Sequence, residues 1–200
     1  MADRSYLVAG LGNIGPEYAA TRHNIGFIVL DAWAQASNLT FDVKRYGALL
    51  TDTIKGRQFH LLKPSTYMNL SGGAIRYWMN ELDILPENLI VVCDDINLPF
   101  GTVRMRLRGS DGGHNGLRNI EEMLQTRDYA RIRIGVGHEF AQGDQIDFVL
   151  GHFSLEQLPL LPQIADKVIN GIKTWAFAGA QKAMSDLNAK APAAENAPNQ

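Results

Sequence analysis

The chain has 200 residues, of which 46% are hydrophobic and 20% charged, and its formal net charge is −2 at pH 7. These values are typical of a globular protein with one substantial core, and they exclude a disordered or fibrous chain. The single cysteine, Cys93, excludes an intrachain disulfide and favours a reducing compartment. No segment approaches the roughly 18 apolar residues that span a bilayer, and the N-terminus has no hydrophobic signal region. We therefore expect a cytoplasmic protein with no membrane partner.

Strand and helix patterns alternate along the chain. In chain order they predict a strand at 5–10, a helix at 24–37, paired strands at 46–54 and 57–63, a helix at 72–82, a buried strand at 87–95, strands at 102–108 and 131–137 around a helix at 116–126, and helices at 154–170 and 172–187. The last pair begins at SLEQ, which resembles a capping box. This order predicts an α/β fold, a single domain over 1–187 with a twisted mixed β-sheet flanked by helices. Residues 188–200 are rich in Ala, Pro and Asn and are expected to form a disordered tail.

The first strand is followed by GLGNIG, in which Gly10, Gly12 and Gly15 spell G-x-G-x-x-G. A dinucleotide-binding motif also needs a helix that opens at the third glycine and an acidic residue about 20 positions later, at a strand end. Asp31 is at that distance but falls inside a predicted helix. The pattern therefore favours a tight turn that presents Asn13. A nicotinamide-dependent oxidoreductase remains the alternative.

Polar side chains recur where the predicted apolar elements end. They are Asn13, His23, Asn24, Asn69, Asp94, Asp95, His114 and Asn115. Taken singly, each has a structural explanation, since Asn beside Gly supplies turns and histidine can cap a helix. Ligands of α/β sheets bind outside the carboxyl ends of the strands, where several loops converge. We therefore expect these side chains to meet in one cleft.

Seven arginines and no lysine lie between Arg104 and Arg133, against four acidic residues. Arginine and apolar residues alternate in TVRMRLR, where Leu107 belongs to the apolar face, and in RIRIGVG, where Arg131 belongs to the polar face. A face of this kind is either simply solvated or binds phosphate. A catalytically silent RNA-binding protein would account for it, but not for the His and Asp near the cleft.

Six motifs in register resemble the bacterial-type peptidyl-tRNA hydrolase family: GLGNIGPEY, TRHNIG, YMNLSG, DDINLP, GGHNGLR and RIRIGVGH. The resemblance runs from about residue 6 to about residue 187. It implies cleavage of the ester that joins a peptide to the ribose of tRNA. The expected partner is peptidyl-tRNA, contacted at its acceptor stem, 3′ end and peptide. We expect a monomer with no cofactor and no metal.

The resemblance also implies roles for individual residues. His23 is expected to be the general base, with Asp94 as its partner. The expected substrate-binding residues are Asn13, Tyr18, Met68, Asn69, His114 and Asn115. The positions that grip the 5′-phosphate of the acceptor stem are Arg106 and Arg133. The loop at 139–147 departs from the family because it lacks the lysines that are frequent there.

The chemistry is consistent with the residues themselves. Histidine is mostly neutral at pH 7 and can take a proton from water, while a carboxylate on its other ring nitrogen fixes the tautomer. Amide groups can donate to a developing oxyanion. The chain has no G-x-S-x-G elbow, and Cys93 lies inside an apolar run. A metal held by His23, Asp94 and His114 has no spacing signature in its favour. Direct attack by water is the mechanism we expect.

Overall fold

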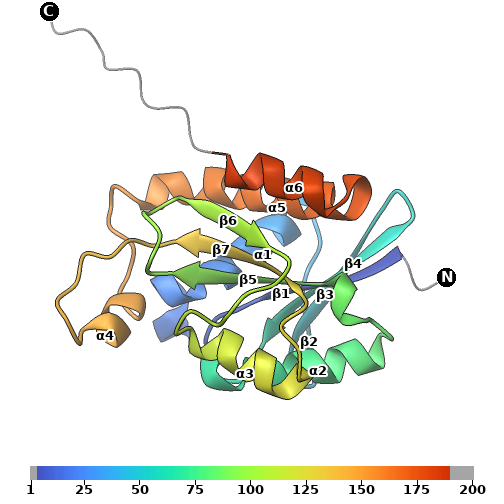
Figure 1. The fold of residues 1–200 in the computed structure, drawn as a ribbon, viewed down its shortest axis with the longest axis horizontal. Coiled ribbons are helices and arrows are strands. Elements are labelled where there is room, and N and C mark those ends of the chain that lie inside the picture. The colour runs from blue at the N-terminus through green and yellow to red at the C-terminus, as the bar shows by residue number, and fades with distance from the viewer. Residues whose placement is uncertain (1–3, 190–200) are drawn as a thin grey trace, which may run out of the picture.

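The computed structural model describes residues 4–189 and contains one seven-stranded mixed sheet with the strand order β2-β3-β4-β1-β5-β7-β6 (Figure 1). The strands are β1 (Ser5–Gly10), β2 (Asp42–Lys44), β3 (Gly47–Ile54), β4 (Arg57–Pro64), β5 (Leu89–Asp95), β6 (Val103–Arg106) and β7 (Ala130–Gly135). The helices are α1 (Ile25–Ala36), α2 (Ser71–Glu81), α3 (Asn115–Leu124), α4 (Gln145–Val149), α5 (Leu161–Ala178) and α6 (Ala180–Asn188). Within residues 4–189, none of the helices is long and apolar enough to cross a membrane.

The four central strands β4, β1, β5 and β7 run parallel, and β3 and β6 pair with them antiparallel. Helices α1, α5 and α6 cover one face of the sheet, and α2 and α3 cover the other (Figure 1). A hydrophobic core lies on each face of the sheet, and successive residues of β1 point into opposite cores: Val8 packs on the α1 side and Leu7 on the α2 side. Burial on both faces explains why β1 and β5 read as continuous apolar runs.

The glycines of the first turn allow close packing between β1 and α1. A Cβ atom at Gly10 would lie 2.4 Å from the carbonyl oxygen of Gly26, the second residue of α1. Gly15, the third glycine of the motif, has a φ of 116° and precedes only a short 3₁₀ turn, η2 (Pro16–Tyr18). The turn therefore lacks the α-helix that a dinucleotide-binding motif requires.

The predicted α/β fold is confirmed, but three local expectations are wrong. The last two helices meet at Gly179, which has a φ of 92°, and not near residue 171. Ser154 and Gln157 exchange the reciprocal hydrogen bonds of a capping box, yet the α-helix begins only at Leu161 because a separate turn, η6 (Leu158–Leu160), intervenes. Leu107 is 41% exposed because β6 ends at Arg106, so it does not continue the apolar face.

The expected tail at 188–200 falls mostly on residues 190–200, which lie outside the described residues. Asn188 itself is the last residue of α6. Its side-chain amide both accepts from the backbone N–H of Met105 and donates to the carbonyl of Met105, at 2.7 and 3.1 Å. This contact satisfies backbone groups on the edge strand β6 and ties α6 to the sheet.

The order of the strands around β1 predicts where a binding crevice lies. From β1 the chain goes to the β3–β4 side of the sheet and then returns to β5, on the other side of β1. Such a reversal opens a crevice at the carboxyl ends of the two strands that flank it. Asn13 follows β1 and Asp94 lies near the end of β5, so both are placed at this point.

Candidate active site

A cavity of about 580 Å³ lies at the carboxyl ends of the parallel strands. Segments that are far apart in the sequence converge on it: the loop after β1, the turn η3 (Arg22–Asn24), the turn η4 (Met68–Leu70), the end of β5, the start of α3, and α4. Seven of the eight residues expected to act in catalysis or substrate binding line it, namely Asn13, His23, Met68, Asn69, Asp94, His114 and Asn115. The eighth, Tyr18 on η2, is not part of the lining.

His23 and Asp94 form a direct pair. Nδ1 of His23 lies 2.8 Å from Oδ1 of Asp94, and only 14% of the His23 side chain and 3% of the Asp94 side chain are exposed. Burial lowers the pKa of His23, but the charge of Asp94 and its hydrogen bond raise it by more, so the net shift is upward. Burial also disfavours ionised Asp94, yet the two histidines that bond to it hold its pKa well below the usual range. Asp94 is therefore ionised at neutral pH.

His114 is the second histidine bonded to Asp94. Its Nε2 lies 2.9 Å from the same Oδ1 atom that His23 contacts, and the two imidazole rings are 5.1 Å apart. Its Nδ1 accepts from the backbone N–H groups of Gly116 and Leu117 and so caps α3. Both ring nitrogens of His114 are thus occupied by protein groups.

Asn13 is fixed by hydrogen bonds on three sides. Its Oδ1 accepts from the backbone N–H of Met68 at 2.8 Å. Its own backbone N–H and carbonyl are both bonded to the side-chain amide of Asn24, at 2.8 and 2.9 Å. Within residues 4–189 no protein group bonds to Nδ2 of Asn13, and this residue lines the cavity. The amide is therefore held with its donor available to a ligand.

Asn69 and Asn115 lie on the turn η4 and at the start of α3, and both are exposed to solvent in the cavity wall. Neither side chain has a protein hydrogen-bond partner within the described part of the chain. Three amide groups from separate segments thus surround the His23–Asp94 pair with unused donors.

Comparison with known proteins agrees with this geometry. A sequence profile described as Peptidyl-tRNA hydrolase matches residues 7–196. The chain belongs to the peptidyl-tRNA hydrolase family. It is 56% identical over 185 residues to peptidyl-tRNA hydrolase of Phocaeicola vulgatus, and the match covers 92% of this chain and 99% of that protein. It is 52% identical over 185 residues to peptidyl-tRNA hydrolase of Bacteroides fragilis, with the same coverage of each chain. A crystal structure of peptidyl-tRNA hydrolase from Acinetobacter baumannii superposes with a TM-score of 0.87 at 32% identity, covering 94% of this chain and 96% of that one.

A second crystal structure, of a peptidyl-tRNA hydrolase in complex with N-propanol, gives a TM-score of 0.88 at 32% identity and covers 96% of this chain and 98% of that one. Family and fold agree, and this hydrolase acts on peptidyl-tRNA. The oxidoreductase and the silent RNA-binding protein are thereby excluded as its function.

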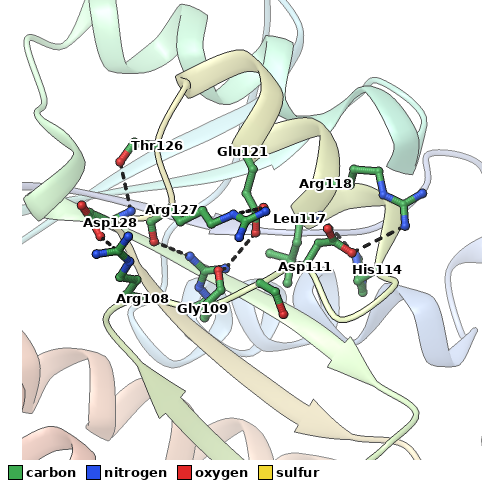
Figure 2. Close-up of polar contacts among 12 residues, drawn as sticks. Arg108, Gly109, Asp111, His114, Leu117, Arg118, Glu121, Thr126, Arg127 and Asp128 are labelled. Carbon is green, nitrogen blue, oxygen red and sulfur yellow. Dashed lines mark hydrogen bonds and ion pairs between the residues drawn. The ribbon is translucent and has the colours of Figure 1, made fainter.

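Most of the seven arginines between Arg104 and Arg133 are paired with carboxylates. Figure 2 shows Arg108 beside Asp128, Arg118 beside Asp111, and Arg127 beside Glu121. Five of these seven arginines form ion pairs, which are Arg108–Asp128, Arg118–Asp111, Arg127–Glu121, Arg131–Glu121 and Arg133–Asp95. Among the seven arginines, all of which are described, only Arg104 and Arg106 have no carboxylate within ion-pair distance.

The expected solvated arginine face is only partly present. Arg131 is fully buried, because α3 covers this part of the sheet and presents Glu121 to it. Its guanidinium also donates to the carbonyls of Gly109 and Arg127, so it fastens the loop before α3 and the chain after it. Arg106 pairs in register with Arg131 but lies on the edge strand and is exposed.

Arg133 lines the cavity, where its guanidinium lies 3.7 Å from a carboxylate oxygen of Asp95 and bonds to the carbonyl of Ser110. Only 18% of its side chain is exposed. Arg133 and Arg106 are diagonal neighbours on one face of paired strands.

The donor atoms of His23, Asp94 and His114 lie within 4.8 Å of one another, the one such grouping of possible metal ligands found within residues 4–189. A metal ion would need nitrogen lone pairs facing the carboxylate. Here both nitrogens that face Asp94 lie within hydrogen-bond distance of its Oδ1, and because an ionised carboxylate only accepts, each of them must carry a proton to bond to it. The remaining nitrogen of His114 is taken by backbone amides. The arrangement therefore fits a hydrogen-bonded relay better than a metal site. Burial raises the pKa of the Cys93 thiol, which also makes this residue a poor nucleophile.

The motif TRHNIG contains two supporting residues, Asn24 and Arg22, whose contacts the sequence does not reveal. Asn24 is 1% exposed and holds the backbone of Asn13, a pairing that a motif cannot reveal because the two residues are 11 positions apart. Arg22 lies over the ring of Phe148 at 4.2 Å and donates to the carbonyl of that residue, which fastens the α4 wall beside His23. Its position next to His23 in TRHNIG is the one signal of this role in the sequence.

Proposed function

We propose that this hydrolase cleaves the peptide–ribose ester by direct attack of water, with His23 as the general base. The single observation that carries the proposal is the 2.8 Å contact between Nδ1 of His23 and Oδ1 of Asp94 inside a cavity rich in unpaired amides. The N–H group at Nδ1 of His23 donates a hydrogen bond to Asp94, so the lone pair on Nε2 is the basic site. This nitrogen has no protein partner within the described residues.

In the first step Nε2 of His23 takes a proton from water while the water oxygen bonds to the ester carbonyl carbon. The carbonyl π electrons move to oxygen, which becomes an oxyanion. The resulting imidazolium is stabilised by the ionised Asp94, whose depressed pKa prevents it from taking the proton itself. Collapse of the intermediate breaks the bond to the ribose oxygen, and His23 returns the proton to that oxygen. The products are the free peptide acid and tRNA.

The amide groups supply the electrostatic part of the mechanism. Asn13 is the best placed for this role, since its Oδ1 is committed to Met68 and its Nδ2 remains available. Asn69 and Asn115 add donors from the other sides of the cavity. A fixed donor aimed at a developing oxyanion is typically worth about 2.7–4 kcal/mol. Met68 shapes the cleft, and Tyr18 would reach only parts of the substrate outside the cavity.

Arg106 and Arg133 are proposed to bind phosphate of the acceptor stem. Arg106 is exposed and has no carboxylate partner among the described residues, so its charge is available to RNA. Arg133 adds a second positive charge, in the wall of the cavity. The fork of a guanidinium suits bidentate contact with phosphate.

One assay tests the proposal. The protein is incubated with N-blocked aminoacyl-tRNA without added cofactor, with and without a chelator, and release of free tRNA is followed. Equal release in both samples is expected. Loss of activity with the chelator, restored by a metal ion, would contradict attack by water activated by His23 alone.

We also propose that the enzyme works as a cytoplasmic monomer. One chain supplies every residue of the cavity, and the substrate belongs to translation. Light scattering at assay concentrations tests the monomer, and a dimer that dissociates together with loss of activity would contradict it.

A further inference from the structure

His114 has no ring nitrogen left for a substrate. Nδ1 accepts from the backbone N–H groups of Gly116 and Leu117 at 3.1 and 3.3 Å, and Figure 2 shows the residue at the N-terminal end of α3 beside Leu117. A nitrogen that accepts from two N–H groups carries no proton. The proton of the neutral ring is therefore on Nε2, which lies 2.9 Å from Oδ1 of Asp94 and donates to it. The start of α3 thus fixes the tautomer of this histidine.

The acceptor of this bond is shared. Oδ1 of Asp94 receives Nε2–H of His114 and Nδ1–H of His23, while the carboxylate is 3% exposed and so has little contact with water. Two donors on one oxygen divide its charge between them. The strength of the hydrogen bond that His23 donates to Asp94 therefore depends on the presence of His114.

We propose that His114 is a positioning residue that acts on His23 through Asp94, and that it is not a substrate-binding residue. Its locked Nε2–H holds the shared oxygen in place and limits how strongly the carboxylate stabilises protonated His23. The proposal rests on the proposed role of His23 as general base. Without His114, Asp94 would interact with His23 alone, and His23 would stay protonated, and inactive as a base, up to a higher pH.

Apart from Asp94, none of the other charged side chains around His23 within residues 4–189 is bonded to the side chain of His114. They are Arg22 on η3 itself, Asp95 on β5, Arg133 on the neighbouring strand β7, Asp31 on α1, Asp144 just before α4, and Asp147 on α4. Three of these charges are already balanced within ion pairs, Arg133 and Asp95 with each other and Asp31 with Lys63. A shift in the pH profile on substitution of His114 would therefore report its own contact with Asp94.

His114→Asn separates this role from a structural one. Asparagine is a favoured N-cap, and its Oδ1 can accept from the same two backbone amides. It is too short to place a donor where Nε2 of histidine reaches Asp94. The matched control is His60→Asn, because His60 is also a largely buried histidine with a side-chain partner, Thr51 at 2.8 Å, but lies on β4 and does not line the cavity.

The readout is kcat and KM as a function of pH. In His114→Asn we expect kcat to fall by about five- to tenfold near about pH 6 and by less than about twofold near about pH 8.5, with KM unchanged, because only protonation of the base is altered. His60→Asn is expected to lower the melting temperature without moving the pH profile. Equal loss of kcat at every pH would assign His114 a purely structural role, and a raised KM would assign it to substrate binding. Either result overturns the proposal.

A measurement without turnover separates this proposal from the proposed function. Histidine ¹⁵N shifts distinguish protonated from unprotonated ring nitrogens. We expect Nδ1 of His114 to be unprotonated at neutral pH, and the titration of His23 to move to higher pH in His114→Asn. A protonated Nδ1 in His114 would overturn the proposal whatever the activity. Failure of the proposed function would instead appear as full activity in His23→Ala.

Discussion

Asn13→Asp isolates the donor that we assign to the oxyanion. The substitution keeps the size of the side chain and an oxygen that can accept from the backbone N–H of Met68, which now lies 2.8 Å away. It removes the Nδ2 donor and places negative charge beside the developing oxyanion. Loss of one such donor raises the barrier by about 2.7–4 kcal/mol, so kcat should fall by about 10²–10³-fold or more.

Asn13→Ala provides the comparison. It also removes the donor, but in addition leaves the buried N–H of Met68 without its acceptor, which costs about 1–3 kcal/mol of unfolding free energy. Denaturant unfolding and steady-state kinetics with N-blocked aminoacyl-tRNA measure the two effects separately. We expect Ala to be the less stable variant and Asp to be at least as impaired in kcat. An Asp variant that turns over clearly faster than the Ala variant would refute the assignment of Asn13 as a donor.

Two further predictions concern the charged residues. Asp94→Asn should lower kcat by about 10²-fold or more. The acid limb of its kcat–pH profile should also move to lower pH, because the charge that raises the pKa of His23 is gone while burial still lowers this pKa. An acid limb at the wild-type pH would contradict the pairing of His23 with Asp94. Arg106→Ala should raise KM and flatten the log–log salt dependence of binding by about one unit, whereas Arg127→Ala, whose guanidinium is already paired with Glu121, should change neither. Equal effects of the two arginine substitutions on binding would show that Arg106 contributes only general charge.

Much of the fold is readable because local patterns determine it. The apolar runs of β1 and β5 are buried on both faces, and the sequence pattern places their ends within a residue or two of Gly10 and Asp95. The cleft could be anticipated because strand ends of a parallel sheet meet at one edge. Those signals lie within a few residues of each other in the chain.

The parts that escaped prediction depend on contacts between distant segments. Arg131 alternates with isoleucines like a solvated residue, and only the position of α3 buries it. Gly171 lies inside α5 and does not end a helix. It is needed for packing, because a Cβ atom at this position would lie 2.5 Å from Leu187 of α6. The second bond of Asp94, to His114, spans 20 positions and is set by how α3 approaches β5. No motif encodes such distances.

In the proposed mechanism His23 acts as the base in the transition state and contributes little to substrate binding. The most direct test is kcat and KM of folded His23→Ala protein for release of tRNA from N-blocked aminoacyl-tRNA. We expect kcat nearly to vanish while KM stays close to that of the wild type, because the removed interaction is made only in the transition state. Near-normal kcat in this variant would contradict it.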